Sequence, residues 1–305
     1  MKEIGGYFEL DRYRLPMLHE EALALNCGRN CLSYLIEARN IKKILLPYFM
    51  CNVVSDTCKK KHVDVRYYHI DEGFLPVFLD VKDGEWLYIA NFYGQLSKDY
   101  LLSVVKEYKY VIIDNAHAYF EAPLENTDTI YTCRKFFGVA DGAFLYTDAE
   151  LQRELELDKS YSRMNFVLGR FEEEASVFYP ESSLNNSNFA NEPVKHMSLL
   201  TRNLLHGIDY EFVKCRRSDN FKCLSDAFHN VNRLNVRHVD GAYAYPLWVH
   251  DGDFIRKELL SHKIYIPILW PNVIKDVSDT FMEYDLAGNI LPLPCDQGMT
   301  PVICN

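Results

Sequence analysis

Apolar residues follow two patterns that alternate along the first half of the chain. Residues 29–39 and 97–108 place apolar side chains at helical spacing, which predicts two amphipathic helices. Short runs of aliphatic, β-branched and aromatic residues predict strands at 43–47, 63–70, 86–93, 110–114, 129–132 and 142–147. Because helix-length segments separate several of these strands, we expect an α/β fold whose large domain has a mostly parallel sheet flanked by helices.

The second half of the chain predicts a smaller domain. Residues 148–194 begin with an acidic stretch of helical character and end in the polar segment SSLNNSNFANEP, so we interpret them as a connecting region. Residues 197–224 are expected to be helical. A strand, a helix and a strand are then predicted at 243–249, 253–262 and 263–269. We therefore place a large domain with its connecting segment at 1–194 and a small C-terminal α+β domain at 195–305.

Charge and cysteine content exclude several classes of protein. The 305 residues include 33 Lys and Arg against 43 Asp and Glu, a formal net charge of −10, which disfavours nucleic acid and anionic membranes as partners. No apolar run reaches the roughly 18 residues that a membrane helix needs, and the first residues lack the apolar core of a signal peptide. The nine cysteines form no Cys-x-x-Cys pair and suggest neither a disulfide framework nor a metal site. We expect a cytoplasmic protein.

Two residues at predicted strand ends carry the candidate chemistry. The motifs of dinucleotide-binding folds, P-loops, hydrolase elbows and zinc peptidases are absent. Asp114 closes the apolar run YVIID, and Lys135 follows the next strand in YTCRK. Ligands of parallel sheets bind beyond the carboxyl ends of the strands. There a carboxylate can pair with the protonated nitrogen of a pyridine cofactor, and a lysine can form a Schiff base with its aldehyde.

A pyridine cofactor with such an aldehyde is pyridoxal phosphate. It also needs a site for its phosphate, and the first predicted helix offers one. Gly28, Arg29 and Asn30 stand at its N-terminus, where free N–H groups and the helix dipole favour an anion, and Thr132 adds a hydroxyl. Each residue alone has an ordinary interpretation as a turn, a cap or a solvated charge. Their order along the chain favours the cofactor, because a phosphate helix, an Asp, a Thr-x-x-Lys and a glycine-containing loop follow one another.

The chain resembles the DegT/DnrJ/EryC1/StrS sugar aminotransferases, which have the type I fold of pyridoxal phosphate enzymes. The resemblance is carried by LLPYFMCNVV, NFYGQ, IIDNAHA and the segment KHMSLLTRNLL, in which His196 replaces an Arg of the family. It implies that Asp114 holds the pyridine nitrogen and that His117 lies against the phenolic oxygen of the cofactor. It also implies that Lys135 carries the Schiff base.

The resemblance implies an enzyme that moves an amino group from an amino acid, usually glutamate, to a nucleotide-linked keto sugar for polysaccharide biosynthesis. It also implies a homodimer, in which residues 182–191 would reach toward the neighbouring subunit. The cations available for the anionic groups of the substrates are Arg163, Lys195, Arg202, Arg216 and Arg217.

Several departures from the family pattern keep an alternative open. Cys51 stands where the family has an aromatic residue against the cofactor ring, so Phe49 or His117 is expected to stack there instead. A final helix is expected to be absent after CDQGMTPVICN. The alternative is a catalytically degenerate protein of this fold that binds a sugar nucleotide or supports a partner enzyme. A small-molecule-binding α/β module without chemistry is a further possibility, whereas sugar dehydration is disfavoured because that branch of the family replaces the lysine by histidine.

Overall fold

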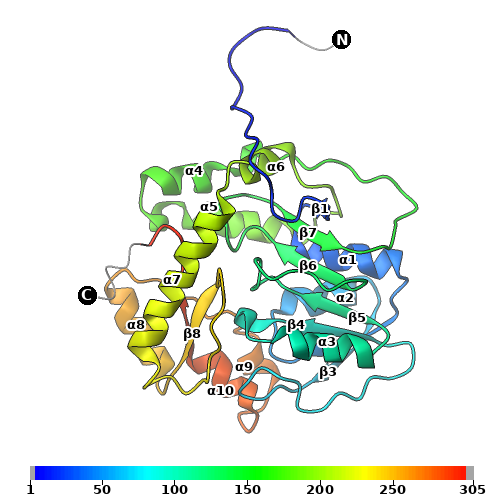
Figure 1. Ribbon diagram of the computed structural model, residues 1–305, viewed down its shortest axis with the longest axis vertical. Helices are drawn as coiled ribbons and strands as arrows, with labels where there is room; N and C mark the ends of the chain where they lie inside the picture. Colours follow the sequence, from blue (N-terminus) through cyan, green and yellow to red (C-terminus); the bar gives the residue numbers. More distant parts are fainter. Residues whose placement is uncertain (1–3, 300–305) are drawn as a thin grey trace.

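A computed structural model describes residues 4–299, and its centre is a seven-stranded sheet in the order β1-β7-β6-β5-β4-β2-β3 (Figure 1). The strands are β1 (Leu23–Leu25), β2 (Lys43–Pro47), β3 (Asp64–Tyr68), β4 (Trp86–Ala90), β5 (Val111–Asp114), β6 (Asp128–Thr132) and β7 (Ala143–Tyr146). Five neighbouring strands of the sheet run parallel, namely β3, β2, β4, β5 and β6. Strands β7 and β1 are antiparallel additions at one edge. The predicted mostly parallel sheet is therefore confirmed.

Helices cover both faces of this sheet, as expected for strands joined by crossovers. Figure 1 shows α3 (Lys98–Glu107) in front of the sheet, whereas α1 (Gly28–Ala38) lies behind it and packs on β6 and β7. In α1 the apolar positions Leu32, Leu35 and Ile36 are buried. A further helix, α2 (Asn52–Lys60), packs on α1 and β3. Within residues 4–299, no helix combines the length and the apolar character needed to cross a membrane.

A second sheet lies in the C-terminal part of the chain, where β8 (Ala244–Trp248) pairs antiparallel with β9 (Ile290–Pro294). The helices of this part are α6 (Leu199–Leu205), α7 (Tyr210–Phe228), α8 (Gly252–Ser261), α9 (Val273–Asp276) and α10 (Met282–Asn289). Trp248, Trp270 and Leu286 belong to the same apolar core as the central strands. The C-terminal part therefore packs directly on the large sheet.

Three predicted elements differ from the structure. The acidic stretch after β7 is not helical, because residues 156–158 instead pair with His196, whose N–H donates to the Glu156 carbonyl at 2.8 Å. Residues 263–269 form no strand, since Pro267 lacks an N–H donor and β8 pairs only with β9 within the described chain. The segment expected as one helix from 197 to 224 is divided into α6 and α7 by a turn at Gly207.

The polar segment expected to be a connection is instead part of a helical hairpin. The two helices are α4 (Asn165–Glu172) and α5 (Ala175–Asn188). The Asn185 amide donates to the Ala140 carbonyl at 2.8 Å, and Phe189 is fully buried. The segment therefore packs on its own chain. The family's final helix would follow the end of CDQGMTPVICN, which lies outside the described residues.

Candidate active site

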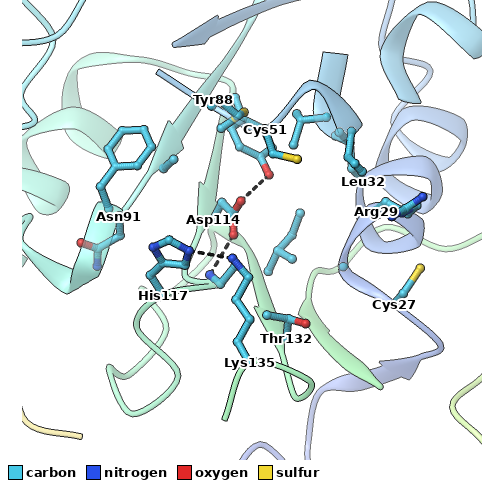
Figure 2. A pocket seen from close by; sticks show the side chains of 18 of the residues that line it. Cys27, Arg29, Leu32, Cys51, Tyr88, Asn91, Asp114, His117, Thr132 and Lys135 are labelled. Carbon is cyan, nitrogen blue, oxygen red and sulfur yellow. Dashed lines mark hydrogen bonds between the residues drawn. The ribbon is translucent and has the colours of Figure 1, made fainter. Parts of the chain in front are cut away.

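A cavity of about 390 Å³ opens where the parallel strands end (Figure 2). Its walls come from the segments that follow β2, β4, β5 and β6, from the start of α1 and from α5. It is lined by Asp114, His117, Thr132, Lys135, Gly28 and Arg29 among the predicted site residues, and also by Cys27, Cys51, Tyr88, Asn91, Arg134, Asn186 and Trp270. Six of the seven residues predicted from the sequence therefore face one cavity.

Asp114 ends β5 at one side of the cavity. Tyr88, on the neighbouring strand β4, donates its hydroxyl hydrogen to Oδ2 at 2.8 Å, and the Ala116 N–H donates to Oδ1 at 2.8 Å. Burial raises the pKa of Asp114, and these two hydrogen bonds and the charge of Lys135 oppose that rise. The structure thus provides an acceptor whose charged form is held by local donors.

Lys135 and His117 form a close pair, with 2.6 Å between Nζ and Nε2. The Tyr93 N–H points at Nδ1 of His117 at 3.4 Å, which assigns the ring proton to Nε2 and makes the neutral amine of Lys135 its acceptor. Burial lowers the pKa of Lys135, although Asp114 opposes this, and burial and Lys135 lower the pKa of His117 far below its usual value. Lys135 remains accessible from the cavity. The surroundings of Lys135 therefore favour its uncharged form, which is the nucleophilic form of an amine.

The start of α1 lies at the other end of the cavity. The first N–H groups of a helix have no partner within the helix, and those of Gly28 and Arg29 belong to the first turn of α1. The N–H groups of Asn30 and Cys31 are bound to the Cys27 carbonyl. The Asn30 side chain points away from the cavity and donates to the Asn26 side chain and to the Pro193 carbonyl. Asn30 therefore anchors α1, and Gly28, Arg29 and Thr132 remain to meet an anion.

Several lining residues were not expected from the sequence. Arg134 stands directly before the predicted lysine, and Tyr88 lies in the predicted strand that leads to NFYGQ, so both had a signal in the sequence. Asn186 and Trp270 give no local signal. Phe49 does not line the cavity, because it is buried in the core with its ring 4.5 Å from that of Trp270. His117 does line it and stacks on Tyr243 with ring centroids 4.3 Å apart. None of the five cations suggested for the substrate anions is among the lining residues.

Within residues 4–299, no group of three or more His, Cys, Asp or Glu side chains is arranged to hold a metal ion. The charged groups that line the cavity are the Asp114 carboxyl, the Lys135 amine and the arginines Arg29 and Arg134. These groups match the functional ends of a pyridine cofactor that carries a phosphate.

Comparison with known proteins defines the fold. The sequence matches no protein-family model and no curated protein. Similar solved structures include CalS13, a sugar aminotransferase from Micromonospora echinospora, with a TM-score of 0.64 at 15% identity over 92% of this chain and 83% of that chain. A DegT DnrJ EryC1 StrS aminotransferase from Brucella abortus has a TM-score of 0.54 at 12% identity, covering 92% and 82%.

A protein from Streptococcus pneumoniae assigned as a sugar aminotransferase, in its PLP form, has a TM-score of 0.59 at 12% identity and covers 90% of this chain and 83% of that chain. The chain therefore has the fold of the sugar aminotransferases. The fold class and the resemblance drawn from the sequence are confirmed at this level.

Proposed function

We propose that this chain is a pyridoxal-phosphate-dependent aminotransferase that acts on a sugar. The observation that carries the proposal is the presence of Asp114 and Lys135 in one cavity, the first a half-buried carboxyl held by two donors and the second an amine whose pKa is lowered. An aminotransferase of this type needs both groups, one facing the ring nitrogen and one reacting with the aldehyde.

The donor set of the cavity fits the cofactor at both ends. Asp114 would hold the proton of the ring nitrogen, and Gly28, Arg29 and Thr132 would meet the phosphate. When bound, pyridoxal phosphate supplies an electron-poor ring that stabilises negative charge on the substrate carbon. Lys135 would then move the proton at that carbon, and Nε2 of His117, 2.6 Å away, orients the lysine Nζ.

The substrates proposed are glutamate as the amino donor and a nucleotide-linked keto sugar as the acceptor, in the cytoplasmic synthesis of a polysaccharide. The sequence motifs support this class, as do structural neighbours that are sugar aminotransferases. One of these neighbours has been solved both in its PLP form and in its PMP form, the two states between which an aminotransferase cycles. We assign Asp114, His117, Lys135 and the start of α1 to these roles.

We also infer that two copies of the chain associate. The α4–α5 hairpin exposes a set of large apolar side chains, and such a surface on a monomer is unfavourable in water. The exposed residues are Leu168, Phe171, Val177, Tyr179 and Leu184. The hairpin also supplies Asn186 to the cavity, so an interface there would lie close to the proposed active site.

Borohydride trapping tests the function. Protein incubated with pyridoxal phosphate is reduced, digested and mapped, and we expect a pyridoxyl adduct on Lys135 that is lost in Lys135→Ala. Lys60, which binds the Ala190 carbonyl outside the cavity, provides the matched control as Lys60→Ala. Adding glutamate to the loaded protein should convert the visible spectrum to that of the pyridoxamine form. A loaded protein that no amino acid converts would instead be a degenerate, non-catalytic member of this fold.

A further inference from the structure

Arg134 stands out among the cavity residues because its charge has no acidic partner. Its guanidinium donates to Oδ1 of Asn186 on α5 and lies over the Phe189 ring, with Cζ 4.9 Å from the ring centroid. No ion pair joins it to a carboxylate of residues 4–299. A guanidinium that is largely removed from water is normally paired with a carboxylate or another anion, because desolvating a charge is costly.

Other cations increase this imbalance. Burial lowers the pKa of Arg134 to about 10, and repulsion from Arg29 and Arg163 adds to the shift, so the side chain remains charged at neutral pH. Arg29 lines the same cavity at the start of α1, as Figure 2 shows. Arg163 lies on the Phe189 ring as well, at 5.1 Å, but it is paired with Asp158 at 2.7 Å and is not among the lining residues. Two unpaired arginines thus share one end of the cavity, which a dianion would neutralise.

We propose that Arg134 binds the phosphate of the cofactor and that α5 positions it there through Asn186 and Phe189. The inference rests on the proposed function and deepens it, because it names a cation of the phosphate site that the sequence motifs do not assign. The N–H groups at the start of α1 and the Thr132 hydroxyl would contact the phosphate, and Arg134 would add the paired donors that suit phosphate oxygens.

This arrangement has a consequence for the hairpin. Asn186 accepts a hydrogen bond from Arg134, so the position of α5 and the orientation of the guanidinium are linked. A side chain that stacks on a buried ring and is bound at its tip loses little further freedom when it meets the ligand. We therefore expect α5 to become more protected from hydrogen exchange when the phosphate is bound, without large movement elsewhere.

The test compares pyridoxal phosphate with pyridoxal, which lacks the phosphate, by spectroscopic titration. In Arg134→Met the dissociation constant for pyridoxal phosphate should rise about ten- to hundredfold, while that for pyridoxal changes little. Arg134→Lys should lie between the two, since it keeps the charge without the paired donors. Arg163→Met is the control, because Arg163 also lies over the Phe189 ring but does not line the cavity. It should leave the ratio of the dissociation constants for pyridoxal phosphate and pyridoxal unchanged. Inorganic phosphate should compete with pyridoxal phosphate in the wild type and much less in Arg134→Met.

The possible results distinguish a failure of the role of Arg134 from a failure of the proposed function. If the wild type binds pyridoxal phosphate and Arg134→Met and Arg134→Lys keep its preference over pyridoxal, the role of Arg134 is refuted while the function stands. If Arg134→Met weakens only glutamate binding, the arginine binds substrate and the inference is wrong. If the wild type binds neither form of the cofactor, the function and the inference both fail. Thermal unfolding of each variant identifies those that fold. If Arg134→Met does not fold, the same comparison is made with Arg134→Lys.

Discussion

The Tyr88 hydroxyl and Oδ2 of Asp114 are 2.8 Å apart on neighbouring parallel strands. The register places Ala90 opposite Asp114, so Tyr88 lies diagonally across and on the same face of the sheet. The hydroxyl donates to the carboxylate and favours its charged form, whereas burial favours the protonated form. The charge of Asp114 therefore depends on Tyr88, which lies two residues before Ala90, the residue directly opposite Asp114.

We predict that Tyr88→Phe moves the acid limb of the activity profile to higher pH. Removing the hydroxyl leaves burial less opposed, so the pKa of Asp114 rises and the carboxylate is lost earlier as the pH falls. Asp114→Asn should fold but lose about a hundredfold or more in kcat at every pH, because an amide cannot stabilise a charged ring nitrogen. The measurement is kcat against pH for both variants. An acid limb that stays in place in Tyr88→Phe would show that Asp114 does not control it.

The sequence predicted the parts of the site that stand at strand ends. Asp114 and Lys135 each follow a short apolar run, and parallel strands bring such ends to one edge, so their meeting required only the fold class. The contact between Arg134 and Asn186 was not predictable in this way. In α5 only Asn185 is buried and Pro180 lies inside the helix, so the segment has neither the apolar stripe nor the composition of a core helix. Its position is determined by tertiary contacts.

We predict a dimer of about twice 35.6 kDa in sedimentation experiments. Phe171, which is 93% exposed on the hairpin, should lie in the contact, so Phe171→Asp should shift the protein toward the monomer. Phe254 on α8 is also exposed, at 64%, and Phe254→Asp provides a control of the same chemistry on another surface. A fully active wild-type monomer would refute the requirement for a second subunit. If Phe171→Asp and Phe254→Asp dissociate the dimer to the same extent, the interface does not lie on the α4–α5 hairpin.

We predict that Gly142→Ala destabilises the loop that follows Lys135. Gly142 has φ +117°, and a Cβ there would lie 3.0 Å from Cγ2 of Thr201 and 3.2 Å from Sγ of Cys133. Its N–H is already fixed to the Asn26 carbonyl at 2.7 Å, so the backbone cannot relax freely. The expected loss in free energy of unfolding is about 1–3 kcal/mol.

Gly288 provides the control for this substitution. A Cβ at Gly288 would meet no atom within 4 Å, and its φ is not in the left-handed region. Because the residue lies in α10, Gly288→Ala should be neutral or slightly stabilising. Urea unfolding of the two variants beside the wild type measures both effects. Equal stability of the two variants would contradict the strain assigned to Gly142.

We predict that acid stability depends on His19, a buried residue that does not line the proposed active site. Its Nε2 lies 2.8 Å from the Tyr119 carbonyl and so donates to it, which leaves Nδ1 as the acceptor for the Tyr146 hydroxyl at 3.0 Å. Both ring nitrogens are thus used by the neutral imidazole. Burial lowers the pKa of His19 to about 4 from its usual 6.5, and the bond to Tyr119 only partly opposes this.

Between these two pH values the unfolded chain binds a proton at His19 and the folded chain does not, so the free energy of unfolding must fall as the pH falls. The loss attributable to this residue is about 1.4 kcal/mol per pH unit, or about 3 kcal/mol in all. His19→Gln keeps a donor and an acceptor but cannot be protonated, so its stability should depend less on pH across this range. Urea unfolding at several pH values between 7 and 4 gives the slopes, with the exposed His250→Gln as the control. Parallel slopes for the wild type and His19→Gln would show that His19 takes up its proton without unfolding.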